Sequence, residues 1–124
     1  MNETSYVIKS EMVQIFPGET LYIETDIVKD SLINLKAVPT IINKEKTITI
    51  SFSQDYENKV HKQMILKVNN PFSKSLIYHA HINLMKTKKW INSSVLPVKP
   101  NLESFEIWPD IITTVVLSDF YLQN

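Results

Sequence analysis

The chain lacks cysteine and arginine, and it contains a single glycine, Gly18. Without cysteine there can be no disulfide scaffold, thiolate zinc site, iron–sulfur cluster or cysteine nucleophile. One glycine is too few for the glycine-rich loops of Walker or dinucleotide sites, and it also excludes a G-x-S-x-G nucleophile elbow. These absences remove many enzyme classes before any strand or helix is assigned.

The chain has no excess of charge of either sign, because 13 lysines and 13 acidic residues give a formal net charge of zero. No long-range field therefore draws it to DNA or to an anionic membrane. Arginine, whose planar guanidinium suits phosphates and base edges, is also missing. We expect no nucleic-acid binding and no membrane insertion, since the longest apolar stretch, 111–117, is too short to cross a bilayer. A protein is the expected partner, and no cofactor is expected.

The first residues, 1–5, contain neither the basic region nor the apolar region of a signal peptide. The expected compartment is therefore the cytoplasm, or the periplasm or the cell exterior if a signal peptide has been removed. The oligomeric state is left open by the sequence.

Residues with β-branched side chains are abundant: 16 isoleucines, 10 valines and 9 threonines. Such side chains favour strands. Apolar residues alternate with a period of two along most of the chain, and no long window has the helical period. The expected strands lie at 6–16, 20–28, 33–37, 47–53, 62–68, 76–84, 94–98, 105–108 and 111–122. This pattern predicts one domain over 1–124, an all-β antiparallel sandwich of the immunoglobulin-like type with eight or nine short strands, or alternatively a small β-barrel.

The alternation also predicts which side chains face the core. In the second and third expected strands the inward side chains are Leu21, Ile23, Ile27, Ile33, Leu35 and Ala37. The first run, 6–16, is apolar on both faces, which suggests a bulge or a strand that changes partners midway. Prolines between 95 and 109 favour an edge position for that segment, since proline cannot donate to a central ladder.

Three histidines form a candidate metal site. If 62–68 and 76–84 pair as a hairpin around 69–75, His61, His79 and His81 lie on the face opposite the apolar side chains. A His-x-His pair on a strand with a third imidazole can hold zinc or copper. The alternative is that these are ordinary polar outward positions, since no acidic side chains stand nearby to support the ligands.

Trp90 and Trp108 are candidate ligand-binding residues, because aromatic rings stack on sugars and anchor peptides. The alternative is that each ring closes one end of the core. The basic turn formed by Lys86, Lys88 and Lys89 is typical of a solvated loop.

Two carboxylate pairs are expected on outward strand faces: Glu24 with Asp26, and Glu103 with Glu106. Acid–base catalysis needs such groups in a pocket with perturbed pKa values. Exposed pairs on strands more often serve solubility. We therefore expect a protein that is not an enzyme.

The stretch 66–80, LKVNNPFSKSLIYHA, resembles the central hairpin of immunoglobulin-like domains in bacterial envelope and secreted proteins. In those domains a V-x-N-P strand is followed by a polar turn and an L-x-Y-x-A strand. The Ile-, Asn- and Lys-rich usage without arginine is similar to that of AT-rich bacterial genomes. The resemblance implies the fold only, since immunoglobulin-like modules host many functions.

Two functions are therefore expected from different classes. The first is a non-catalytic interaction or structural module, which would bind through its loops or by strand addition at an exposed edge. The second is a small-ligand or metal-binding protein that uses the face with His61, His79 and His81.

Overall fold

The computed structural model describes residues 7–8 and 11–124, so that Tyr6, Lys9 and Ser10 of the first expected strand lie outside the described residues. Strands make up 67% of the structure and helix 3%. The helical part is one 3-10 turn, Lys44–Lys46. The all-β prediction is confirmed.

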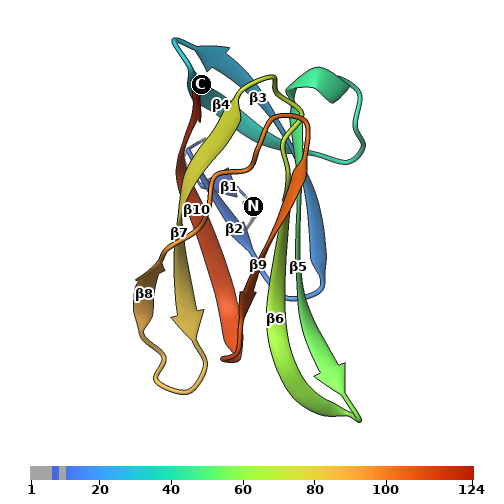
Figure 1. The fold of residues 1–124 in the computed structure, drawn as a ribbon, viewed down its shortest axis with the longest axis vertical. Helices are drawn as coiled ribbons and strands as arrows, with labels where there is room; N and C mark the ends of the chain where they lie inside the picture. Colours follow the sequence, from blue (N-terminus) through green and yellow to red (C-terminus); the bar gives the residue numbers. More distant parts are fainter. Residues whose placement is uncertain (1–6, 9–10) are drawn as a thin grey trace.

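The described residues form ten strands. They are β1 (Val7–Ile8), β2 (Met12–Ile15), β3 (Glu19–Val28), β4 (Ser31–Val38), β5 (Thr47–Glu57), β6 (Val60–Asn69), β7 (Ser75–Leu84), β8 (Trp90–Ser93), β9 (Glu103–Trp108) and β10 (Ile112–Gln123). All pairings among these strands are antiparallel, and together they make one sheet that curls into a half-barrel (Figure 1).

The sheet has two parts that meet at β10. One part has the order β1-β2-β10-β7-β8, and the other has the order β4-β3-β5-β6-β9. They join where Tyr121 of β10 pairs with Ser31 of β4, and where the Leu122 N–H donates to the Asp30 carbonyl at 2.7 Å. The hydrophobic core fills the space that the curled sheet encloses. Fully buried side chains from both parts include Val13, Phe52, Met64, Leu66, Leu76 and Leu117.

The prediction that 62–68 and 76–84 pair as a hairpin is wrong. β6 pairs with β5 and β9, whereas β7 pairs with β10 and β8. Both strands point their alternate apolar side chains into the same core, so the alternation alone could not distinguish neighbours in a sheet from strands in its two different parts. The connection is anchored by buried Asn70, whose side-chain amide donates to the Val98 carbonyl at 3.0 Å and accepts from the Phe72 N–H at 2.8 Å.

Because of a β-bulge in β4, some residues of β3 and β4 that were expected to point inward are exposed. The register shifts between Glu24 and Asp26, so that Asn34 (φ 54°) is an extra residue in β4. Beyond the bulge the inward side chain is Leu32, and Ile33 is exposed, contrary to the prediction. Ile27, also expected inside, is 40% exposed.

A second bulge interrupts β10. Its register against β7 shifts between Ser118 and Tyr121, and Asp119 has a φ of 55°. The buried positions change from Leu117 to Phe120 across it, a spacing of three. Phe120 can therefore stack on Tyr78 of β7, with ring centroids 5.9 Å apart.

The two parts of the sheet end in β8 and β9, which are both edge strands among the described residues. The expected strand at 94–98 is absent, and that segment contributes only the isolated bridge between Val98 and Leu76. Side chains close the open side instead. The Trp108 indole donates to the Ser93 hydroxyl at 2.8 Å, and the Leu96 N–H donates to the Glu106 carboxylate at 2.7 Å.

Candidate functional site

The three histidines lie on two strands that do not pair with each other. His61 on β6 is held at both ring nitrogens: Nδ1 lies 2.9 Å from the Gln54 amide nitrogen, and Nε2 lies 2.9 Å from the Pro109 carbonyl. His79 on β7 lies 3.2 Å from the Asp119 carboxylate. Among residues 7–8 and 11–124, no group of three His, Cys, Asp or Glu side chains could hold a metal ion. The zinc or copper site stays a prediction, which zinc titration can test.

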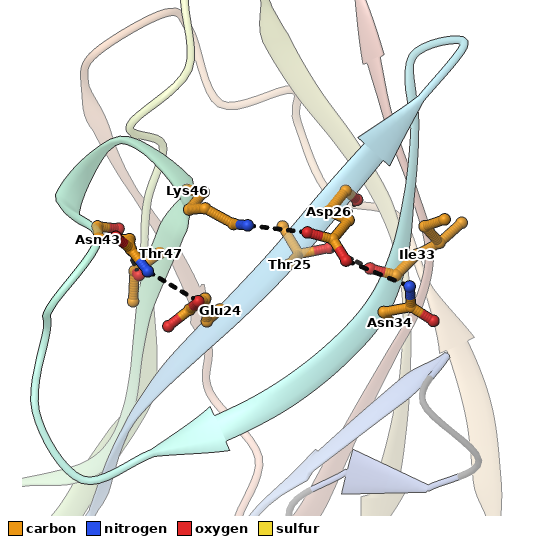
Figure 2. Close-up of polar contacts among 8 residues, drawn as sticks. All are labelled: Glu24, Thr25, Asp26, Ile33, Asn34, Asn43, Lys46 and Thr47. Atoms are coloured by element: carbon orange, nitrogen blue, oxygen red, sulfur yellow. Dashed lines mark hydrogen bonds and ion pairs between the residues drawn. The ribbon is translucent and has the colours of Figure 1, made fainter.

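Glu24 and Asp26 do share the outward face of β3, but hydrogen bonds from neighbouring side chains hold both carboxylates (Figure 2). Asn43 donates to Glu24 at 2.9 Å. Asp26 accepts from Lys46 at 2.8 Å and from Asn34, the bulge residue, at 3.2 Å. These bonds tie the loop before β5 and the bulge of β4 to β3.

The Lys46–Asp26 bond shifts the pKa values of both of its partners. The hydrogen bond from Lys46, then that from Asn34, lowers the pKa of the Asp26 carboxyl below its usual value. The hydrogen bond between Lys46 and Asp26 also raises the pKa of the Lys46 ammonium. Asp26 and Lys46 form an exposed ion pair at neutral pH, and a carboxyl group with a lowered pKa is a poor general base.

The two carboxylates of the second expected pair, Glu103 and Glu106, do not share one face of their strand. Glu103 and Glu106 are three residues apart on β9, so their side chains point to opposite faces. Glu103 is exposed, whereas Glu106 is half-buried and accepts the Leu96 N–H. The expectation that both lie on one outward face is wrong because an odd spacing on a strand changes the face.

The two tryptophans also lie on different faces. Trp108 is half-buried and meets Phe52 edge-on, with centroids 6.4 Å apart, while its N–H reaches Ser93. Trp90 on β8 pairs with Asn83 of β7 and is exposed. The structure therefore does not bring the rings together at one groove, and Trp108 helps to close the core.

The most distinctive surface is the free edge of β9. β9 pairs with β6 on one side, and no other described strand pairs with it. The Asn70 N–H donates to the Leu102 carbonyl at 2.9 Å, and this position continues the β6–β9 register. Because backbone groups alternate in direction along a strand, those of Glu103, Phe105 and Ile107 point away from β6.

The outer face of this edge is apolar. The side chains of Phe105 and Ile107 are 57% and 54% exposed. Ile107 pairs with half-buried Ile65, and the Lys67 ammonium lies 5.8 Å from the Phe105 ring centroid. The expected edge position of the proline-rich segment indicated this site, but the sequence did not show that its outward side chains are apolar.

No described helix is long or apolar enough to cross a membrane. Comparisons with protein-family models, with curated proteins and with solved structures found no match for this chain.

Proposed function

We propose that this chain is a non-catalytic, immunoglobulin-like interaction module that binds an extended segment of a partner protein along β9. The observation that carries the proposal is the free edge of β9 with exposed Phe105 and Ile107. Natural proteins usually protect such edges with charges, bulges or covering loops. Here β8 and the segment after it contact β9 through side-chain bonds rather than a backbone ladder, so the outward backbone groups of β9 stay unpaired by a described strand. An edge that is regular and apolar on its outer face suits strand addition, in which main-chain bonds give affinity and side chains give specificity.

The arrangement of the strands supports the sandwich rather than the small barrel. Two parts of five strands each contribute to one core, and the 66–80 stretch that resembles immunoglobulin-like domains passes from one part to the other. One side-chain bond links β9 to β8 and another links β9 to the segment after β8, whereas a closed barrel would join the edges by a backbone ladder.

The carboxylates support a non-catalytic role. Glu24 and Asp26 are engaged in structural hydrogen bonds, and Glu106 caps the Leu96 N–H. General acid–base work requires a carboxylate whose proton affinity is tuned in a concave site, and these groups instead join neighbouring segments.

Peptide selection followed by amide hydrogen exchange tests the proposal. A displayed library of random extended peptides is selected on the folded protein, and exchange is compared with and without the selected peptide. We expect the peptide to slow exchange at Glu103, Phe105 and Ile107, because their N–H groups point to the free edge. Ile107→Pro removes one of these donors without breaking the β6 ladder, and it should weaken binding at least about fivefold.

Ser53→Lys is the matched control, since Ser53 is exposed and pairs with Ile65 on the same outer face, but belongs to the interior strand β5. It should leave the affinity unchanged. If selected peptides slow exchange on another edge, or bind the Ile107→Pro protein as tightly as the unchanged one, β9 is not the binding edge.

A further inference from the structure

A hollow lies between two turns at one end of the molecule. The turn at 85–89 joins β7 to β8, the turn at 109–111 joins β9 to β10, and both lie at the lower end of Figure 1. The Met85 N–H donates to the Ile111 carbonyl at 3.0 Å, which holds the turns together. The hollow has a volume of about 550 Å³, and its apolar wall consists of Leu84, Met85, Pro109 and Ile111. We call it the tip hollow.

Positive charge gathers beside the tip hollow. Lys86 lines it, and Lys88 and Lys89 follow on the same turn, all three exposed. In the described part of the chain, none of these ammonium groups has a carboxylate within salt-bridge distance. Asp110 is the one acidic residue of the lining. The turn therefore keeps uncompensated positive charge although the whole chain is neutral.

The turn that carries these lysines has a defined backbone. The Leu84 N–H donates to the Lys89 carbonyl at 3.0 Å, and the Lys88 N–H donates to the Leu84 carbonyl at 2.7 Å. Lys88 itself has a φ of 60°, which makes the chain turn back on itself. A surface that is ordered before binding loses less conformational entropy when a ligand arrives.

We propose that the tip hollow binds an acidic peptide segment with one bulky apolar side chain, which enters the hollow while neighbouring carboxylates meet the lysines. Charge complementarity selects the acidic partner, and the apolar wall with half-exposed Met85 selects the anchor side chain. The concave shape favours a peptide over a bilayer, because membrane-binding surfaces insert protruding apolar side chains and stable binding needs more basic residues or a lipid anchor.

The probe is a synthetic peptide with one central phenylalanine and two aspartates on each side. Binding is followed by the amide NMR shifts of the protein at low and high ionic strength. We expect shifts at 84–89 and 109–111, and weaker binding at high salt. The combined changes Lys86→Gln, Lys88→Gln and Lys89→Gln should raise Kd about tenfold, and Met85→Gln about fivefold.

The matched control combines Lys29→Gln, Lys36→Gln and Lys44→Gln, which removes the same charge from exposed positions on other elements. It should leave Kd unchanged, as should Ile107→Pro, so a failure at β9 and a failure at the tip hollow are distinguishable. The proposal is overturned if the peptide does not bind, if the control loses as much affinity, or if vesicles rich in phosphatidylserine bind through these lysines and the peptide does not.

Discussion

At the scale of single residues, two buried hydroxyl groups in the described part of the chain, those of Tyr78 and Ser104, have no hydrogen-bond partner. Tyr78 is 3% exposed, its ring stacks on Phe120, and its hydroxyl has no hydrogen-bond partner. An unsatisfied buried hydroxyl costs about 1–3 kcal/mol. Burial raises the pKa of the Tyr78 phenol, and the Glu106 carboxylate adds to the rise.

Tyr78→Phe should therefore leave the protein as stable at neutral pH, or make it more stable by up to about 1 kcal/mol. Above the ordinary tyrosine pKa of 10.0, the unfolded chain loses the Tyr78 proton while the folded chain keeps it, so stability falls as the pH rises. Denaturant unfolding across this alkaline range should show a shallower fall for the Tyr78→Phe protein. Parallel pH curves for the two proteins would contradict the assignment.

At the scale of the element, the bulges at Asn34 and Asp119 change which side chains enter the core. Asn34 in β4 and Asp119 in β10 both have positive φ values, and after each of them the inward positions change parity. Asparagine and aspartate tolerate this conformation better than other residues with a side chain, and β-branched residues tolerate it worst. The polar residue at each bulge therefore allows an odd apolar spacing within a strand.

Asn34→Val and Asn34→Gly both remove the side-chain bond to Asp26. A comparison of the two variants therefore isolates the effect of the backbone conformation at this position. Asn34→Val should destabilise the fold by about 1–3 kcal/mol relative to Asn34→Gly, because valine resists a positive φ. Urea unfolding midpoints of the two variants measure the difference. Equal midpoints would show that the bulge does not require the left-handed conformation.

The bulges are also the places where the inward side chains could not be predicted from simple alternation in the sequence. Period-two alternation predicted the all-β class and most strands, and it correctly placed Leu21 and Ile23 inside. It failed at Ile33 because the alternation was assumed to continue unbroken through Asn34. The spacing of three between Leu32 and Leu35 was a readable signal of the bulge.

Strand partners and the candidate site were harder to predict. Alternation says which face of a strand is apolar, but not which strand lies beside it, so the pairing of β6 with β7 was wrongly expected. The β9 edge became recognisable only once its single neighbour was known. Phe105 and Ile107 had the spacing of a core face, and their exposure depends on which side of β6 faces inward.

At the scale of the whole molecule, side chains rather than a backbone ladder close the open side of the half-barrel. The Trp108–Ser93 bond links β9 to β8, and the Glu106–Leu96 bond reinforces it from the connecting segment. A single side-chain hydrogen bond contributes about 0.5–1.5 kcal/mol. We expect this closure to open more easily than the long ladders between β7 and β10 or between β5 and β6.

A double-mutant cycle measures this closure. Trp108→Phe removes the indole donor but keeps an aromatic ring beside Phe52, and Ser93→Ala removes the acceptor. The two substitutions should be non-additive by about 0.5–1.5 kcal/mol in the free energy of unfolding. Additive effects would mean that the bond does not hold the edges together.

The place of β10 in the sheet has a consequence for the order in which the protein can fold during synthesis. β10 leaves the ribosome after every other described strand, yet it pairs with β2, β7 and β4. Hairpins such as β3–β4 and β5–β6 can form as they emerge, but β2 must wait with its apolar face uncovered. The nascent chain therefore exposes unpaired strands with apolar side chains, which are prone to aggregate, until translation of β10 is complete.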